Sequence, residues 1–340
     1  MPNLPFSISA SLSKHLPKSR TAVATAAASD IRETLFRSPQ LCPPTSPPCN
    51  TASHTFLAPS SSRSITTQSN SNLCRNKQLT ARNTATMSTM PAQHGHSKAC
   101  CNIPPIVSSG YEAKGVYEQI GGYKTYVTGP SGTTKGVVTI YDIFGYYPQT
   151  LQGADIVASY GATKYKVFIP DWFQGEPAPL EWFPPDTDEK KTKLGDFFQN
   201  NSPPSVASQI PGYIKALSEK YPEIKEWAIL GFCWGGKVVS LVSASPENPF
   251  KAGVEVHPAM VDPKDAEKIK IPLALLASKD EYPDDVKNFE ANLTGPKYVE
   301  TFPDQIHGWM AARSDLSDER VKHEYKRGYE TVLNFLNQHL

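Results

Sequence analysis

The pattern of apolar and polar positions changes sharply near residue 114. From there on, short runs rich in β-branched and aromatic residues alternate with longer stretches in which apolar residues recur at helical spacing. This alternation is typical of a mostly parallel sheet with helices on both faces. The runs expected to form strands are 115–120, 123–128, 136–141, 166–169, 227–230, 253–256, 272–277 and 298–302. The stretches expected to form helices are 149–160, 205–220, 235–244, 262–268, 283–293 and 318–339.

Only Gly121 and Gly122 separate the first two predicted strands, which predicts an antiparallel hairpin at the N-terminal side of the sheet. The remaining strands and helices alternate, so the sequence predicts one α/β domain over residues 111–340. Two Pro-rich segments, 171–186 and 200–204, are long connections of the kind that can cover a site.

Residues 1–110 lack this pattern, and we expect them to form a disordered extension. Residues 1–90 contain no Gly, Tyr or Trp, and 28 of them are Ser or Thr, so they cannot build a core. The Ser-rich, acid-poor composition also resembles an organelle transit peptide, which is one alternative for residues 1–86. An over-extended gene model is another, since Met87 and Met90 could each begin the protein.

The charge balance gives no reason to expect a polyanionic or membrane partner. The chain has 34 basic and 33 acidic residues, a formal net charge of +1, which argues against nucleic acid binding. No run of apolar residues is long enough to span a membrane. We expect a monomer that takes a small-molecule substrate.

Cysteine usage bears on compartment and on metals. Only Cys233 lies in the predicted domain, which excludes a disulfide framework there and favours a reducing compartment. We therefore expect a cytoplasmic protein, or a mitochondrial one if residues 1–86 are a transit peptide. Adjacent Cys100 and Cys101, with His94 and His96 nearby, match no usual zinc spacing, so we expect no metal and no other cofactor.

The most informative segment runs from the predicted strand 227–230 into the predicted helix 235–244. It reads Gly231-Phe232-Cys233-Trp234-Gly235, the nucleophile elbow with cysteine in place of serine. The turn is so tight that only glycine fits two residues before and two residues after the nucleophile. Cys233 would then stand at a helix N-terminus, which favours a thiolate, and the Trp234 N–H would face a developing oxyanion. The alternative is a buried structural cysteine beside packing glycines.

An acid and a histidine should follow such an elbow in that order, each just after a strand. Asp280 follows the predicted strand 272–277, and His307 follows the predicted strand 298–302. His257 follows another predicted strand, but it precedes the acid, so we expect it to line the pocket or to pack.

Five short motifs together resemble the dienelactone hydrolase family, the cysteine branch of the α/β-hydrolases, and its fungal members in particular. The resemblance covers about residues 111–340. The motifs are D-I-F-G at 142–145, P-D-W-F-Q-G at 170–175, G-F-C-W-G-G at 231–236, S-K-D-E at 278–281 and H-G-W at 307–309.

The resemblance implies an α/β-hydrolase fold, no cofactor, and a role for each matching residue. Cys233 would be the nucleophile, His307 the base and Asp280 the acid that orients it, with Ile143 N–H joining Trp234 N–H in the oxyanion hole. The dienelactone-cleaving members have Glu where Asp142 stands, and that Glu is implied to hold the resting thiol. Asp142 is one methylene shorter than that Glu, which is a departure from the pattern of those members.

The residues that would contact the substrate depart from the bacterial pattern. Bacterial members hold a substrate carboxylate with arginines near the lid loop and after the catalytic histidine. Here the lid stretch reads Gln174-Gly175-Glu176, and Arg313 is the nearby candidate on the second side. Arg313 either binds an anion or is solvated at a helix start. Aromatic residues are expected to line the pocket or to form core: Phe144, Tyr146, Tyr147, Trp172, Phe173, Trp234 and Trp309.

The sequence therefore predicts a hydrolase that cleaves a lactone or small carboxylic ester through a Cys-His-Asp triad and a thioester intermediate. The alternative is a non-catalytic ligand-binding or redox-sensing protein of the same fold.

Overall fold

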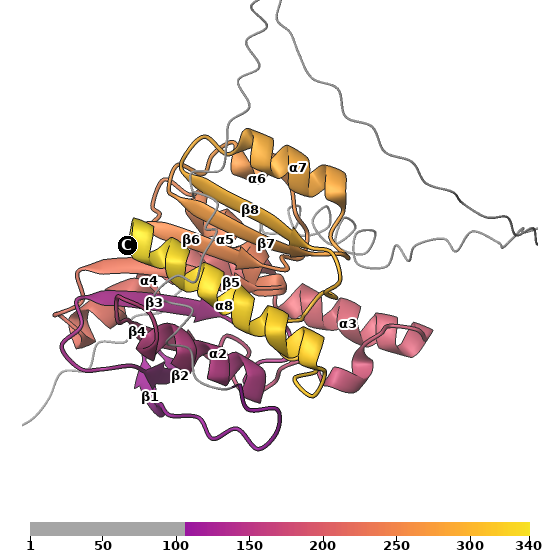
Figure 1. The fold of residues 1–340 in the computed structure, drawn as a ribbon, viewed down its shortest axis with the longest axis horizontal. Helices are drawn as coiled ribbons and strands as arrows, with labels where there is room; N and C mark the ends of the chain where they lie inside the picture. The colour runs from indigo at the N-terminus through magenta and orange to yellow at the C-terminus, as the bar shows by residue number, and fades with distance from the viewer. Residues whose placement is uncertain (1–105) are drawn as a thin grey trace, which may run out of the picture. The chain divides into compact units, whose positions relative to one another are not determined.

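The computed structural model describes residues 106–340 (Figure 1). The expectations for residues 1–105, including the extension, the targeting signal and the Cys100–Cys101 pair, lie outside the described residues.

The core of the domain is one eight-stranded sheet, as the sequence predicts. Its strand order is β1-β2-β4-β3-β5-β6-β7-β8, with β1, β2 and β4 paired antiparallel and all later pairs parallel. The strands are β1 (Val116–Ile120), β2 (Tyr123–Thr128), β3 (Lys135–Ile140), β4 (Lys166–Pro170), β5 (Glu226–Phe232), β6 (Ala252–Val256), β7 (Leu273–Ser278) and β8 (Lys297–Phe302).

Helices cover both faces of this sheet, which completes the predicted α/β-hydrolase arrangement. Helices α2 and α8 pack together on one face, and α4 and α5 pack together on the other (Figure 1). The helices are α2 (Pro148–Ser159), α3 (Asp188–Asn200), α4 (Pro203–Lys220), α5 (Trp234–Ser243), α6 (Pro263–Ala266), α7 (Pro283–Asn292) and α8 (Glu319–His339), with a short 3₁₀ turn at Leu180–Trp182.

The local sequence explains the main features of the sheet. Gly121 and Gly122 both have positive φ, 58° and 90°, which is the conformation that the β1–β2 hairpin requires. Strand β5 is apolar from Trp227 to Leu230 and buried on both faces, as expected for a central parallel strand. Because β5 to β8 run parallel, the segments that follow them gather at one edge of the sheet.

Residues 106 and 107, which precede the predicted boundary at 111, already contact the domain. Ile106 is buried in the core, and the backbone of Val107 makes two hydrogen bonds to the Gln152 side chain of α2, at 2.8 and 3.1 Å. Farther along, the buried Asp155 of α2 accepts hydrogen bonds from the Tyr111 hydroxyl and from the Lys114 N–H. The segment before β1 is therefore fastened to α2.

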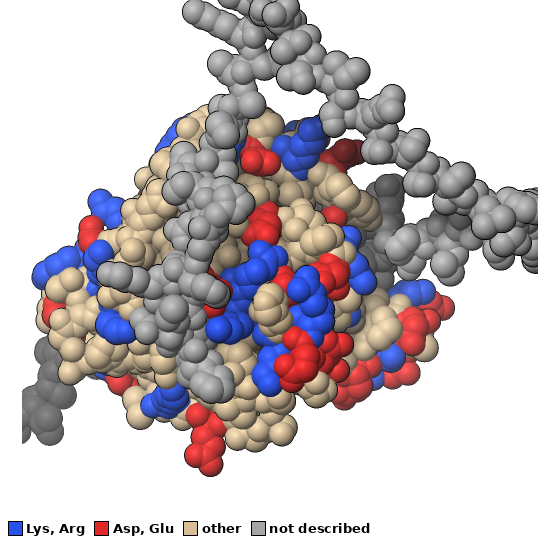
Figure 2. Space-filling view, viewed as in Figure 1, with Lys and Arg blue, Asp and Glu red and all other residues tan. Residues whose placement is uncertain are grey.

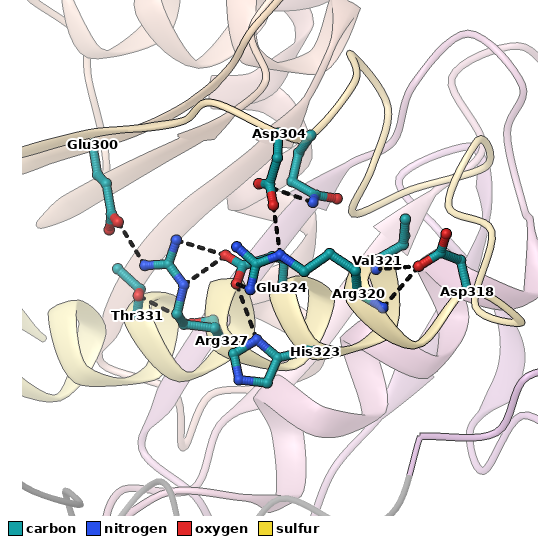
Figure 3. A network of polar contacts seen from close by, with 10 residues as sticks. Glu300, Asp304, Asp318, Arg320, Val321, His323, Glu324, Arg327 and Thr331 are labelled. Atoms are coloured by element: carbon teal, nitrogen blue, oxygen red, sulfur yellow. Dashed lines mark hydrogen bonds and ion pairs between the residues drawn. The ribbon is translucent and has the colours of Figure 1, made fainter. Parts of the chain in front are cut away.

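A network of charges joins α8 to the outer strand β8 and to the loop after it (Figure 3). Buried Glu324 pairs with Arg320 at 2.8 Å and with Arg327 at 2.6 Å. Arg320 also binds Asp304 in the loop, and Arg327 also binds Glu300 in β8. A network with a buried carboxylate at its centre holds its partners more firmly than isolated exposed pairs do. The network thus fixes the start of the loop that leads to His307.

The surface on the α8 side carries acidic and basic side chains that are intermixed (Figure 2). Within residues 106–340, no helix combines the length and the apolar character that crossing a membrane would need.

Glu255 of β6 is a buried carboxyl group in the layer between the sheet and α5. It is 1% exposed and hydrogen-bonds the Ser240 hydroxyl at 2.6 Å. Burial raises the pKa of Glu255 to about 8, although Ser240 and the nearby Lys237 partly oppose the shift. Glu255 therefore stays protonated in the folded protein at pH values where the unfolded chain has lost the proton.

We predict that Glu255→Gln makes the protein less sensitive to pH between about 5 and 8. Over this range the folded state holds a proton that the unfolded state releases, so Glu255 lowers the free energy of unfolding as pH rises, by up to a few kcal/mol. Urea unfolding of both proteins at pH 5 and pH 8 measures this. The stability of the variant relative to the native chain should rise with pH, and parallel pH curves would contradict the assignment.

Candidate active site

Cys233 occupies the tight turn between β5 and α5, as the elbow pattern predicts. Its φ is +53°, a strained conformation for a residue with a side chain. A Cβ on Gly231 would lie 2.2 Å from the Gly235 carbonyl oxygen, and one on Gly235 would lie 2.3 Å from the Ile140 carbonyl oxygen. Both glycines are thus required by close backbone contacts. The side chain of Cys233 is a free thiol that is partly exposed.

The segment after β6 holds this turn in place. The Cys233 N–H donates to the Val256 carbonyl at 3.1 Å, and the Cys233 carbonyl accepts from the Ala259 N–H at 2.9 Å. The end of β6 and the residues after it therefore stabilise Cys233 through both its N–H and its carbonyl group.

His307 lies beside Cys233, close enough for the two side chains to interact electrostatically. On the other side of the ring, Nδ1 is 2.6 Å from Oε1 of Glu281. Burial by itself would lower the pKa of His307, but the negative charges of Cys233 and Glu281 outweigh it and raise the pKa to about 10. This pKa favours an imidazolium held between Cys233 and the Glu281 carboxylate.

The acid on the imidazole ring is Glu281, which differs from the expected Asp280. Oδ2 of Asp280 instead accepts the backbone N–H of His307 at 2.8 Å, and Asp280 itself is exposed. Glu281 is buried, and it also accepts hydrogen bonds from the N–H and the hydroxyl of Ser278. The sequence prediction named Asp280 alone, because the order of strand, acid and histidine does not tell which of two adjacent carboxylates turns inward.

Ile143 and Trp234, the predicted oxyanion-hole residues, follow β3 and begin α5, respectively. Trp234 is the first residue of α5, so its N–H has no partner inside the helix. Ile143 follows β3 by three residues, and the end of β3 is in direct backbone contact with Gly235. The Ile143 carbonyl accepts the Ala178 N–H at 2.9 Å, which ties this turn to the connection that follows β4.

Asp142 is buried, and both of its carboxylate oxygens accept backbone N–H groups. Oδ1 accepts from Phe144 at 2.9 Å and Oδ2 accepts from Ala312 at 3.1 Å. Burial raises the pKa of Asp142 to about 6, although the two N–H bonds and the cations of His307 and Arg313 oppose the shift. Asp142 is therefore a backbone-bonded carboxylate, and this geometry does not support direct substrate contact.

His257 lies under the imidazole of His307. It is fully buried, and its ring is 5.2 Å from that of His307, centroid to centroid, in an edge-to-face arrangement. Neither ring nitrogen has a partner within the described residues, and φ is +38°. Burial lowers the pKa of His257 well below its usual range, and the charges of His307 and Arg313 lower it further. The expected packing role fits a neutral ring.

Arg313 is half-buried beside His307, six residues before α8 begins, so the alternative of a solvated helix start does not hold. Nη1 donates to the His307 carbonyl at 2.6 Å. The guanidinium lies 4.5 Å from the ring centre of Phe183, which itself packs edge-on against Phe144. Arg313 thus lies beside His307, and Phe144 is connected to Arg313 through the ring of Phe183.

Tyr146 and Trp172 have structural partners in β2, β4 and α4. The Tyr146 hydroxyl donates to the Ile169 carbonyl at 2.8 Å, and the buried Trp172 ring packs against Tyr123 and Tyr213. These contacts indicate that both residues pack within the protein, which favours a structural role over substrate contact.

The lid connection between β4 and α4 contains α3, which the sequence pattern does not reveal. The Trp234 indole N–H donates to the Asn201 carbonyl at 2.9 Å, and Phe173 packs against both Phe197 and Trp234. Helix α3 is strongly polar, and the apolar residues Leu194, Phe197 and Phe198 at helical spacing are the signal that could have indicated it. Among residues 106–340, no group of three or more His, Cys, Asp and Glu is placed to hold a metal ion.

We predict that Glu281→Gln lowers the pKa of His307 by about 1 to 2 units, because it removes the carboxylate that stabilises the imidazolium. Asp280→Asn should change the pKa by much less, since Asn keeps an acceptor for the His307 N–H and that bond does not involve the ring. NMR titration of the His307 ring resonances in both variants measures the difference. A larger shift in Asp280→Asn would reverse the assignment.

The family model of the dienelactone hydrolase family matches residues 123–340. An uncharacterised AIM2 family protein of Schizosaccharomyces pombe is 35% identical over 224 residues, which are 64% of this chain and 88% of that protein. A carboxymethylenebutenolidase homolog of Xenopus tropicalis is 28% identical over 257 residues, 72% of this chain and 99% of that protein.

Among solved structures, a dienelactone hydrolase from Anabaena variabilis aligns with a TM-score of 0.48 and 14% identity, covering 67% of this chain and 98% of that one. The family match supports a hydrolase of esters or lactones. The family model matches most of this chain, and the AIM2 family protein of Schizosaccharomyces pombe is 35% identical to it. This chain therefore belongs to the dienelactone hydrolase family.

Proposed function

We propose that this protein hydrolyses a lactone or a small carboxylic ester with Cys233 as the nucleophile. The observation that carries the proposal is the continuous arrangement Cys233, His307 and Glu281 on a nucleophile elbow. A structural cysteine would need neither the strained turn nor an imidazole held in place by a buried carboxylate.

The first half of the reaction uses the charge already present at the site. The Cys233 thiolate attacks the carbonyl carbon, and the N–H groups of Ile143 and Trp234 stabilise the oxyanion that forms. When the tetrahedral intermediate collapses, the bond to the leaving oxygen breaks and that oxygen takes the proton of the His307 imidazolium. The product is a thioester on Cys233 and, for a lactone, the leaving hydroxyl remains attached to the acyl group.

The second half depends on a change in the basicity of His307. Once Cys233 is a thioester, the negative charge that raises the pKa of His307 is gone, so the neutral imidazole can accept a proton from water. The hydroxide formed attacks the thioester, and its collapse releases the carboxylic acid and restores the thiolate with protonated His307. The reaction consumes one water and needs no redox partner.

In this proposal Glu281 and Asp280 hold different parts of His307. Glu281 sets the ring orientation and stabilises the imidazolium, while Asp280 fixes the backbone position of the same residue. The triad is accordingly Cys-His-Glu, in place of the predicted Cys-His-Asp.

We further propose that Arg313 receives an anionic group of the substrate. Its guanidinium is half-buried next to His307, and Nη1 alone is used by the His307 carbonyl, which leaves further N–H donors for a carboxylate. Phe183 and Phe144 would then contact the apolar part of the same substrate.

Cys233→Ala should lower the hydrolysis of short-chain p-nitrophenyl esters at least about a thousandfold, as expected for loss of a nucleophile. The melting temperature should change little, because the side chain is small. Stoichiometric alkylation should abolish activity, with the modification located at Cys233 by peptide mass spectrometry. A chain with Cys100 and Cys101 changed to Ala is the matched control and should remain active. If the native chain with intact Cys233 hydrolyses no member of an ester and lactone panel, the ligand-binding or redox-sensing alternative replaces this proposal.

Arg313→Ala should lower kcat/KM for a carboxylate-bearing lactone by roughly 10- to 150-fold, the value of a lost charge-assisted hydrogen bond. A neutral ester of similar size should stay within about threefold. Arg313→Lys is the control, because it keeps the charge and loses the planar donors. Equal losses on both substrates would mean that Arg313 only supports the His307 loop, and no loss on either would point to neutral substrates.

A further inference from the structure

We propose that Asp142 is a positioning residue that holds the oxyanion turn and the His307 loop at a fixed separation through its two carboxylate oxygens. The inference rests on the proposed function. It concerns how the oxyanion turn and the loop that carries His307 are held in place relative to each other.

The first oxygen organises the oxyanion turn. Oδ1 accepts the Phe144 N–H at 2.9 Å, two residues on, and the Asp142 carbonyl accepts the Gly145 N–H at 3.2 Å. Gly145 has a φ of +75°, which permits the sharp turn. Ile143 lies inside this turn, so the direction of its N–H is set by the bonds that Asp142 makes.

The second oxygen reaches the loop that carries His307. Oδ2 accepts the Ala312 N–H at 3.1 Å, across 170 positions of sequence. The segment between His307 and Ala312 is a compact run of turns, in which Ala311 N–H donates to Gly308 at 3.0 Å. The next residue, Arg313, donates to the His307 carbonyl at 2.6 Å. Holding Ala312 therefore holds the backbone of His307.

Burial and charge explain why a carboxylate serves here. Asp142 is 1% exposed, and a carboxylate can accept an N–H on each oxygen, whereas an amide side chain accepts on only one. The cations of His307 and Arg313 face the carboxylate and offset the cost of its charge. The hydroxyls of Tyr147 and Tyr329 lie within its electrostatic reach from the start of α2 and from α8. With both oxygens committed to backbone N–H groups, the carboxylate acts on the two loops and not on the thiol.

The test is Asp142→Asn, which keeps the shape and leaves one of the two N–H groups facing an amide nitrogen. We expect kcat for an ester substrate to fall about 10- to 100-fold, with KM within about threefold, because the loss affects the alignment of the oxyanion donors and the base. The rate at which iodoacetamide alkylates Cys233 should stay within about twofold of the native value. A parallel change in alkylation rate would show that Asp142 acts on the thiol, and unchanged kcat would overturn the inference.

Two further variants separate position from charge and from stability. Asp142→Glu keeps the charge but displaces the oxygens by one methylene, so it should retain at most about a tenth of native kcat; full activity would mean that charge alone matters. Asp155→Asn is the matched control, since Asp155 is equally buried in α2 and holds Tyr111, Tyr126 and Lys114 N–H. It should lower the melting temperature and leave kcat unchanged.

The inference and the proposed function fail in different ways. If Cys233→Ala remains active, the nucleophile assignment is wrong, whatever Asp142 does. If Cys233→Ala is inactive while Asp142→Asn has native kcat, the function stands and only the positioning role is lost.

Discussion

The close approach of β3, β5 and α5 at Cys233 is the constraint on which the rest of the site depends. Gly231 and Gly235 each leave room for a carbonyl oxygen that any side chain would displace. This contact forces Cys233 into a positive φ and aims its side chain out of the sheet edge, at a cost of order 1–3 kcal/mol. Packing and the hydrogen bonds of the Cys233 backbone to Val256 and Ala259 offset this strain energy. The strain therefore arises at β3 and β5, and the hydrogen bonds that offset it come from the segment at the end of β6.

The same sheet edge concentrates charge in a small volume. The carboxyl groups of Glu281, Asp280 and Asp142 lie there together with the cationic groups of His307 and Arg313. Each buried carboxylate has specific partners: Glu281 has the imidazole and Ser278, and Asp142 has two backbone N–H groups. Because the interior screens charge weakly, these pairings decide the protonation of His307 and hence when it can donate or accept a proton.

The connection between β4 and α4 links the site to the rest of the domain. Ala178 is bonded to the Ile143 carbonyl at its beginning, and Asn201 is bonded to the Trp234 indole at its end. Both contacts fall on residues whose N–H groups are the expected oxyanion donors. The covering segment and the donors are therefore parts of one packed unit, in which Phe183 brings an aromatic ring to Arg313.

The sequence by itself determined the elements and most of the site, because strand and helix periods and the spacing of Gly231, Cys233 and Gly235 are local properties. Parallel topology then brings the residues after β5, β7 and β8 together, so the chain order of Cys233, an acid and His307 was enough to find them. Only the tertiary structure decided which of Asp280 and Glu281 faces the ring, and that Asp142 bonds two distant loops. It also decided that Tyr146 and Trp172 have partners in β2, β4 and α4, while Arg313 lies beside His307. Those outcomes depend on the direction of individual side chains and on contacts across as many as 170 positions, which no local pattern encodes.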